Sequence, residues 1–446
     1  MPIPQATVAR ASRGAMEVVL RQLQQYLANN TWLSPTNRYA TDTIDRLRSD
    51  SAAGSQLVSA DLVQYIAASA PVHLLDGWAF LGRAVDASLR GDPDTARHLA
   101  YYAELRAAMA LLATEGLGVF SDRHFLIDQS GQPLTNLPTW GTHSIVWELL
   151  KSWSQLPCAA NLVGQIIAVG GVSLSGWIRH FGLAAGNAFQ PIAAKWLPAW
   201  GLDLGQFSQD KNARNVASYR PTSLVLRTPA RITDSFNAVD DIWSALEPAV
   251  RGKFNVIDSY LLRLTIEEIS KSVSVNISTP NARKRYRLEV GRMIANASPS
   301  GDQARLRAFL LRRTSKKDRD ILELARGTDP VWAPNHHLQV LSRAALLLRV
   351  AGGACALLLQ SGGVSLSNLR FWWSEIGEAR GCWDRASAPQ DVTDLWADIA
   401  DALSEIHSRQ SGRGKRVSLL KWRSDSLSQI DVLGECERIG LWGINV

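Results

Sequence analysis

Most of the sequence patterns that would assign this 446-residue chain to an enzyme class are missing. It contains no glycine-rich phosphate loop ending in Gly-Lys-Ser/Thr, no Gly-x-Gly-x-x-Gly, no Gly-x-Ser-x-Gly and no His-Glu-x-x-His. These patterns respectively hold nucleotide phosphates, dinucleotides, a serine nucleophile and zinc. We therefore expect no cofactor and no bound metal, and the sequence leaves open whether the chain is an enzyme.

Cysteine is also scarce. The four cysteines form no Cys-x-x-Cys pair and lie near no histidine at zinc-ligand spacing, which argues against both a disulfide framework and a zinc site. Cys158 and Cys355 lie in apolar stretches, so we expect both to be small core residues. The chain begins without the apolar block of a signal peptide, and the stretches 162–172 and 344–359 fall short of the ~20 apolar residues of a membrane span. These features predict a cytoplasmic protein with no membrane partner.

The bulk composition is that of a globular protein with a sizeable core, since 46% of the residues are hydrophobic and 20% are charged. The length predicts two or three domains. The net charge is +7, and arginine greatly outnumbers lysine. Arginine enrichment fits phosphate recognition by the guanidinium fork, and it also follows from a GC-rich coding sequence, which is the more common cause. Both interpretations stay open at this point.

Apolar periodicity predicts a mainly α-helical fold of multi-helix bundles with a small β-hairpin insertion. Gly91 and Pro93 separate two long helices expected over 57–89 and 95–115. A hairpin with its turn at 129–131 follows, and a helix should begin near Thr142 with this residue as its cap. Other helices are expected at 14–27, 161–169, 175–184, 204–217, 336–359, 366–376 and 391–406, with extended segments at 223–226 and 272–279. We expect an N-terminal helical segment (1–55), a helical bundle with the hairpin (56–222) and a basic, mainly helical C-terminal domain (223–446).

The helix expected over 95–115 has two unusual features. An alanine stripe at three- and four-residue spacing predicts close approach of another helix. The same helix carries a dense set of polar side chains, which either form a phosphate or acid–base site or a buried network that fixes helix packing. For the first interpretation the candidate catalytic residues are Glu104, Arg106, His143 and Asn215. The surrounding polar cluster would comprise His98, Tyr101, Tyr102, Arg214, Tyr219 and Arg220.

The segment from His98 to Ala107, with the hairpin that follows it, the Thr142-His143 helix start and the Arg214–Arg220 helix end, resembles HEPN-like helical domains, in particular YaaC-like proteins. The resemblance covers about 57–221. It implies a small helical bundle of the kind found in bacterial toxin and antiviral defence systems, where many members are ribonucleases. Their activity requires Arg followed four to six residues later by His, and this chain has no such pair. The resemblance therefore favours a relative that lacks this catalytic site.

A strongly basic stretch runs from residue 283 to 317. Its candidate nucleic-acid-binding residues are Arg283, Lys284, Arg285, Arg287, Arg312, Arg313, Lys316 and Lys317. Clustered cations neutralise backbone phosphates, although a solvated basic face or a dock for an acidic protein would look alike. We therefore expect a bacterial defence-type protein that binds nucleic acid or partner proteins. The alternatives are a metal-independent or non-standard nuclease and a structural subunit whose sixteen tryptophans form contact faces.

Overall fold

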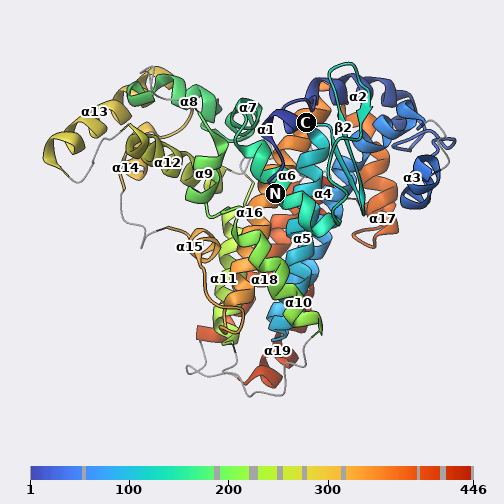
Figure 1. Cartoon of the computed structure of the whole chain (residues 1–446). Helices are drawn as coiled ribbons and strands as arrows, with labels where there is room; N and C mark the ends of the chain where they lie inside the picture. The colour runs from blue at the N-terminus through green and yellow to red at the C-terminus, as the bar shows by residue number, and fades with distance from the viewer. Residues whose placement is uncertain are drawn as a thin grey trace.

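The computed structural model describes residues 2–52, 57–184, 191–219, 230–248, 255–273, 279–312, 318–388, 392–411 and 418–442. Within these ranges the chain is mainly helical, with a three-stranded and a two-stranded antiparallel sheet, which confirms the predicted fold class. Figure 1 shows a stem of long helices with one group of helices projecting to its left and the helices of residues 13–52 lying on its right.

Three long helices form the centre of the stem: α4 (Ser59–Leu89), α5 (Pro93–Thr114) and α16 (His336–Ser361). Asp92 caps α5 by accepting from the Thr95 amide, and Gly91 (φ +74°) makes the left-handed turn between α4 and α5. The alanine stripe of α5 is fully buried, and α5 packs against both α4 and α16. The expected close approach of helices is therefore confirmed.

Shorter helices surround this centre. Their bounds are α10 (Gln206–Tyr219), α11 (Ile232–Ala245), α15 (Asp320–Arg326), α18 (Val392–Ser411), α19 (Leu419–Leu433) and α20 (Glu437–Trp442). On the other side lie α1 (Gln5–Val8), α2 (Arg13–Leu27) and α3 (Thr43–Ala52), with η4 (Leu366–Leu369), η5 (Trp372–Ile376), α17 (Gly377–Ala379) and η6 (Arg385–Ser387). Because α16 packs against α4 and α5, the core includes segments from both sides of the domain boundary expected near 222.

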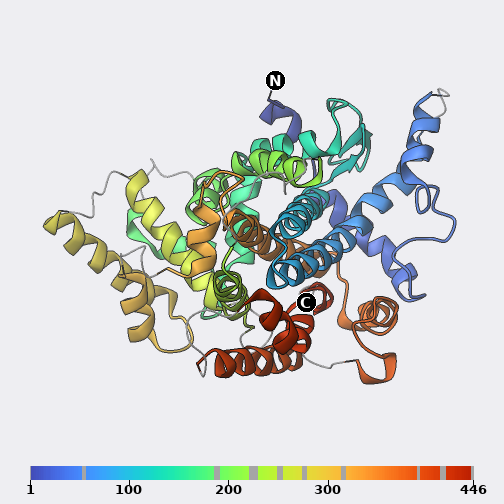
Figure 2. The same ribbon diagram turned by 90° about the horizontal axis from the view of Figure 1, so that it is seen from below.

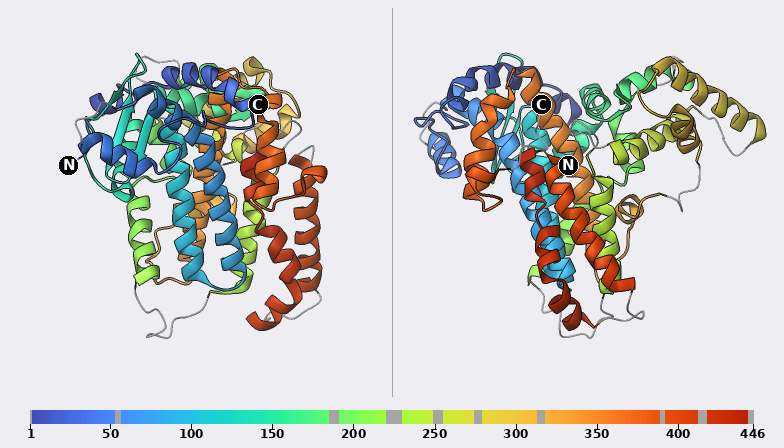
Figure 3. Two further views of the ribbon diagram at one scale, coloured as in Figure 1. Left: turned by 90° about the vertical axis from the view of Figure 1, so that its right-hand side faces the viewer. Right: turned by 180° about the vertical axis from the view of Figure 1, so that it is seen from behind.

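The predicted hairpin belongs to a three-stranded sheet of β1 (Leu117–Phe120), β2 (Arg123–Ile127) and β3 (Pro133–Leu134). The turn expected at 129–131 joins β2 to β3, whereas the tighter turn between β1 and β2 was not predicted. This sheet lies beside the long helices of the stem (Figure 3). The next helix, α6 (Thr142–Ser154), begins where expected, but Gly141 is its cap residue and the Thr142 hydroxyl donates to the Ser121 carbonyl (3.4 Å).

We call the group of helices that projects from the stem the arm. It comprises α8 (Leu174–His180), α9 (Ala193–Ala199), α12 (Asn255–Ser272), α13 (Pro280–Ala297) and α14 (Gln303–Leu310). The helix α7 (Pro157–Ile166), the sheet of β4 (Ala168–Val169) with β5 (Val172–Ser173) and the short η1 (Gly182–Ala184) lead into it. Seen from below, α13 lies at the outer edge of the arm, on the opposite side of the molecule from α3 (Figure 2).

One expectation from the sequence is wrong, and two others concern segments that lie wholly or partly outside the described residues. Cys158 is exposed, because it sits in the first turn of α7, whereas Cys355 is buried in α16 as predicted. The expected extended segment at 272–279 begins with the last residue of α12, while 274–278 and 223–226 lie outside the described residues. By length and composition α16 could cross a membrane, but 72% of its most apolar window is buried here, as in the central core helix that the sequence predicted.

Candidate functional site

Glu104, on α5, lies in the centre of the stem and is fully buried. Across from it the guanidinium of Arg343 (α16) binds both oxygens of Asp210 (α10) at 2.8 and 2.7 Å and donates to the carbonyls of Ala325 and Gly327. Its Nε is 3.7 Å from Glu104 Oε1. This arrangement ties α5, α10 and α16 together.

The protonation of this network follows from its burial. Loss of hydration, and then the nearby Asp210 carboxylate, raise the pKa of Glu104 well above its usual value. Neither Glu104 oxygen has a hydrogen-bonding partner among the described residues, and this environment favours the neutral carboxyl. Glu104 is therefore a neutral packing residue, with no access to a substrate.

A second buried group lies at the start of α5 and α16. The Arg97 side chain donates to Asp94 (2.6 Å) and to Nδ1 of His336 (3.3 Å). Burial, and then the positive charge of Arg97, lower the pKa of His336 to about 3 and that of His337 to about 4. Both histidines are neutral at pH 7, and they serve packing between the two helices.

Arg214 of α10 meets α5 and α6 around His143. Its guanidinium carbon lies 5.5 Å from the ring centroids of both Tyr101 and Tyr102, and its Nη2 is 3.3 Å from His143 Nε2. The Tyr101 hydroxyl is 3.0 Å from His143 Nδ1. Burial, and then the charge of Arg214, lower the pKa of His143, so this side chain is neutral at pH 7.

The other residues of the predicted polar cluster lie at its edge or beyond it. His98 Nδ1 is 2.7 Å from the Ser218 hydroxyl, and its ring contacts Tyr102. Tyr219 is 77% exposed, and Arg220 lies outside the described residues. For Asn215, half-buried on α10, the described part of the chain offers no side-chain hydrogen bond. The structure therefore groups four of the six predicted cluster residues around His143.

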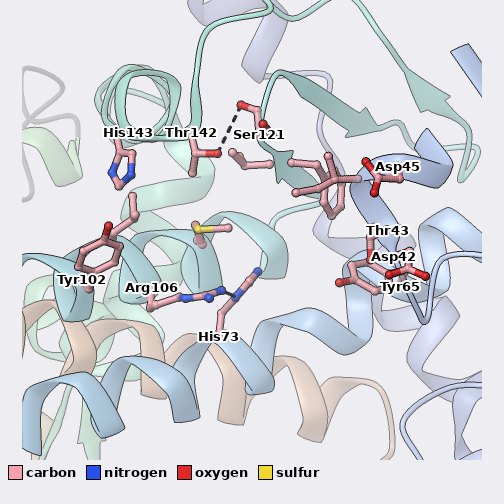
Figure 4. Close-up of a pocket in the computed structure, with 15 residues that line it drawn as sticks. Asp42, Thr43, Asp45, Tyr65, His73, Tyr102, Arg106, Ser121, Thr142 and His143 are labelled. Carbon is pink, nitrogen blue, oxygen red and sulfur yellow. Dashed lines mark hydrogen bonds between the residues drawn. The ribbon is translucent and has the colours of Figure 1, made fainter. Parts of the chain in front are cut away.

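Arg106 faces away from Glu104, into a cavity of about 520 Å³ that we call the Arg106 cavity. Figure 4 shows Asp42 and Asp45 at one end of it and Arg106, Tyr102 and His143 at the other. Its lining comes from α3, α4, α5, β1, the β1–β2 turn and α6: Asp42, Thr43, Ile44, Asp45, Tyr65, His73, Tyr102, Leu105, Arg106, Met109, Val119, Phe120, Ser121, Thr142 and His143. Two of the four residues predicted for catalysis, Arg106 and His143, thus share one cavity.

His73 of α4 holds Arg106 in place. Arg106 Nη1 donates to His73 Nδ1 (2.8 Å), and its Nη2 is 3.9 Å from Asp76. Burial, and then the charge of Arg106, lower the pKa of His73 to about 3, so a neutral imidazole accepts the bond from the Arg106 guanidinium. The sequence did not single out His73, Tyr65 or Asp42, because they come from separate segments and carry no motif.

Two further buried ion pairs organise the arm. Arg349 of α16 binds both oxygens of Asp258 (α12) at 3.1 and 2.7 Å and donates to the Ile166 carbonyl, so this pair joins the arm to the stem. Arg263 of α12 pairs with Asp318 and, at 2.8 Å, with Glu267. Such pairs are costly to desolvate and stabilise the fold only when well coordinated, as here.

The predicted basic surface lies on α13 and α14. Arg283, Lys284, Arg285 and Arg287 are exposed on the first two turns of α13, whereas Tyr286 between them is buried. Arg312 differs from them: it pairs with Asp318 (3.3 Å) and lies over the rings of Tyr260 and Phe309, so it belongs to the packing of the arm. The remaining predicted residues, Arg313, Lys316 and Lys317, lie outside the described residues.

The residues described here include no group of three or more His, Cys, Asp or Glu arranged to hold a metal ion. No protein-family model matches this sequence, and no curated protein and no solved structure matches it significantly. The arm and the Arg106 cavity are therefore the two features of this structure that point to a function.

Proposed function

We propose that this chain binds nucleic acid through the arm, with α13 as the main contact surface. One observation carries the proposal. Residues 279–312 contain eight Lys and Arg against two Asp and Glu, a net charge of +6, while the whole chain carries +7. The rest of the protein is close to neutral, and its excess charge is concentrated on one projecting part. Neutralising backbone phosphates, with release of their counterions, is the main source of affinity in such surfaces.

The local geometry supports this use of α13. Tyr286, Val290 and Met293 are buried and fix one face of the helix on the arm, and α13 packs on α8 and α14. The intervening cations are exposed, and the helix α13 that carries them lies at the outer edge of the molecule (Figure 2). Guanidinium groups bind phosphate oxygens in pairs, and contacts of this kind position a backbone without reading its bases. We therefore propose binding with little dependence on base sequence, and the HEPN-like resemblance makes bacterial defence the proposed setting.

The alternative of a structural subunit with tryptophan contact faces receives less support. Of the sixteen tryptophans, eleven are buried and four more pack against the core. Trp332, at 70% exposure, stands alone among them. The tryptophans therefore stabilise the interior and do not form a shared surface for a partner.

The test is a titration of labelled single- and double-stranded DNA and RNA with the full chain at several salt concentrations. We expect affinity to fall steeply with salt. The variant in which four exposed cations of α13 become alanine should bind at least tenfold more weakly, with a log–log salt slope shallower by about 0.9 for each duplex phosphate that the variant no longer neutralises. The substitutions are Arg283→Ala, Lys284→Ala, Arg285→Ala and Arg287→Ala.

A matched control removes four exposed arginines elsewhere, so that both variants have the same net charge. The control substitutions are Arg10→Ala, Arg21→Ala, Arg83→Ala and Arg370→Ala. Retained binding in the control, with loss in the α13 variant, assigns the interface to α13. Equal losses of affinity in both variants would show that the net charge, and not the position of the cations on α13, causes the effect. Absence of binding to every nucleic acid at low salt would overturn the proposal and favour an acidic protein partner.

A further inference from the structure

The Arg106 cavity has the features of a built small-molecule site. Its volume of about 520 Å³ lies in the range of cavities that hold small ligands. Leu105, Met109, Val119 and Phe120 provide apolar walls, and the polar groups lie at its two ends. The ends carry opposite charge, with Arg106 at one and the Asp42 carboxylate at the other (Figure 4), while the neighbouring Asp45 is exposed and pairs with Arg48 at 3.5 Å.

Several polar groups of this cavity are left for a ligand. Arg106 uses one short hydrogen bond, to His73, and its nearest carboxylate is 3.9 Å away. Within the described residues, the hydroxyls of Tyr65 and Tyr102 and the Asp42 carboxylate have no hydrogen-bonding partner. Five guanidinium N–H donors in a fixed plane suit a phosphate, and most of those of Arg106 remain unused.

The Arg106 cavity is also lined by residues with strained backbone conformations. Four non-glycine residues of the described chain have positive φ, and two of them, Asp42 (+52°) and Ser121 (+49°), line this cavity. Such conformations persist where the surroundings hold them, and they cluster at binding sites. The segment before Asp42 is held firmly: the buried Tyr39 hydroxyl donates to Asp50 (2.9 Å), and the Thr43 hydroxyl donates to the Tyr39 carbonyl (2.7 Å).

We propose that the Arg106 cavity binds a nucleoside monophosphate whose base carries an exocyclic amino group. The phosphate lies on Arg106, the base packs against Tyr65 and Phe120, and its amino group donates to the Asp42 carboxylate. An anion at one end, an aromatic body and a donor at the other end match the order of groups along the cavity. The helix α3, whose first turn lines the cavity, and α13 lie on opposite sides of the molecule (Figure 1), so this site is separate from the proposed nucleic-acid interface and the inference is independent of it.

Calorimetric titration of the full chain tests this with four probes: AMP, IMP, adenosine and inorganic phosphate. AMP should bind with one-to-one stoichiometry. IMP differs by a carbonyl in place of the amino group, and it should bind at least tenfold more weakly because its oxygen faces Asp42. Adenosine and phosphate each lack half of the ligand and should also bind at least tenfold more weakly. Failure of AMP to saturate the protein at millimolar concentration would overturn the proposal.

Two variants locate the site. Arg106→Gln should weaken AMP binding at least tenfold, and Arg83→Ala, which removes an exposed arginine outside the cavity, should leave AMP binding unchanged. If Arg106→Gln does not fold, Asp42→Asn replaces it, since Asp42 is exposed and asparagine also accepts positive φ. Asp42→Asn should remove the preference for AMP over IMP. Unchanged discrimination, or equal loss in Arg83→Ala, would overturn the assignment.

The α13 alanine variant separates this proposal from the first. It should bind AMP as the unmodified chain does while losing nucleic acid, and Arg106→Gln should do the reverse. If AMP binding disappears with the α13 substitutions, the nucleotide sits on the basic surface, and the cavity assignment fails while nucleic-acid binding stands.

Discussion

Arg343 and Arg349 of α16 and Arg285 and Arg287 of α13 are the same residue type in two different settings. The first two are buried and bind aspartates 133 and 91 residues away in sequence. The second two face solvent on a projecting helix. The composition alone does not separate these uses, because the partner carboxylate of a buried arginine can come from any part of the chain. Arginine richness therefore reflects packing in the stem and, as we propose, phosphate binding on the arm.

The largest expected effect concerns the buried pair of Asp210 and Arg343. Asp210→Asn removes the carboxylate that makes both short hydrogen bonds to Arg343 and leaves Glu104, at 3.7 Å, as the nearest carboxyl group; it should lower the free energy of unfolding by about 3–5 kcal/mol. Glu104→Gln should cost less than about 1 kcal/mol, because burial favours the neutral carboxyl and glutamine is a neutral side chain of the same shape. Urea denaturation of both variants measures the difference. Equal losses would show that Glu104 is ionised and that our description of the network is wrong.

A somewhat smaller and more local effect is expected from Asp258, which joins the arm to the stem through Arg349. Asp258→Asn should destabilise this junction by about 3 kcal/mol and speed amide hydrogen exchange in α12 more than in α5. The control is Glu289→Gln, which breaks the Glu289–Arg292 pair on α13, where Arg292 is exposed. Uniform exchange changes across the whole molecule would contradict a local role for Asp258.

Acid should destabilise the stem through the paired histidines. The unfolded chain takes up protons on His336 and His337 near pH 6.5, whereas the folded pKa values are about 3 and 4. Stability is therefore complete above pH 6.5 and falls as the pH drops from there toward 4, by up to about 1.4 kcal/mol per pH unit for each histidine.

Glu104 and Glu115, whose pKa values are raised in the folded chain, change the stability in the opposite direction, and they do so with or without the two histidines. Comparing the unmodified chain with the double variant His336→Gln/His337→Gln therefore isolates the contribution of the histidines. Denaturation curves at pH 7.5 and 5.0 should show a smaller loss in the double variant. The same loss in both proteins would remove the histidines as its cause.

The smallest effect on stability is expected on α13. Each of Lys284→Ala, Arg285→Ala and Arg287→Ala should change the free energy of unfolding by no more than about 0.5 kcal/mol, because these side chains are exposed. Thermal melting followed by circular dichroism measures this. A loss above about 1 kcal/mol for any one of them would mean that the exposed arginines also serve packing, and the contrast with the stem would weaken.

Local sequence signals determined the helical fold well. Gly91 and Asp92 delimit α4 and α5, and the alanine stripe requires a close helix neighbour, so these features follow from caps and periodicity within one segment. Shorter helices of the second half, such as α11 and α12, were not predicted. They lack clear start and stop signals, and packing against neighbours compensates for their weaker local preference.

The sequence by itself determined a mainly α-helical chain with a basic segment at 283–317 and a polar face on α5. Only the tertiary structure decided how that polar face divides. Glu104 and Arg106 are two residues apart, about 200° around the helix axis, so one points into the core and the other into a cavity. The groups that complete each side, Asp210 and Arg343 for one and His73 and Asp42 for the other, come from separate segments. Their proximity depends on chain topology, which no local pattern records.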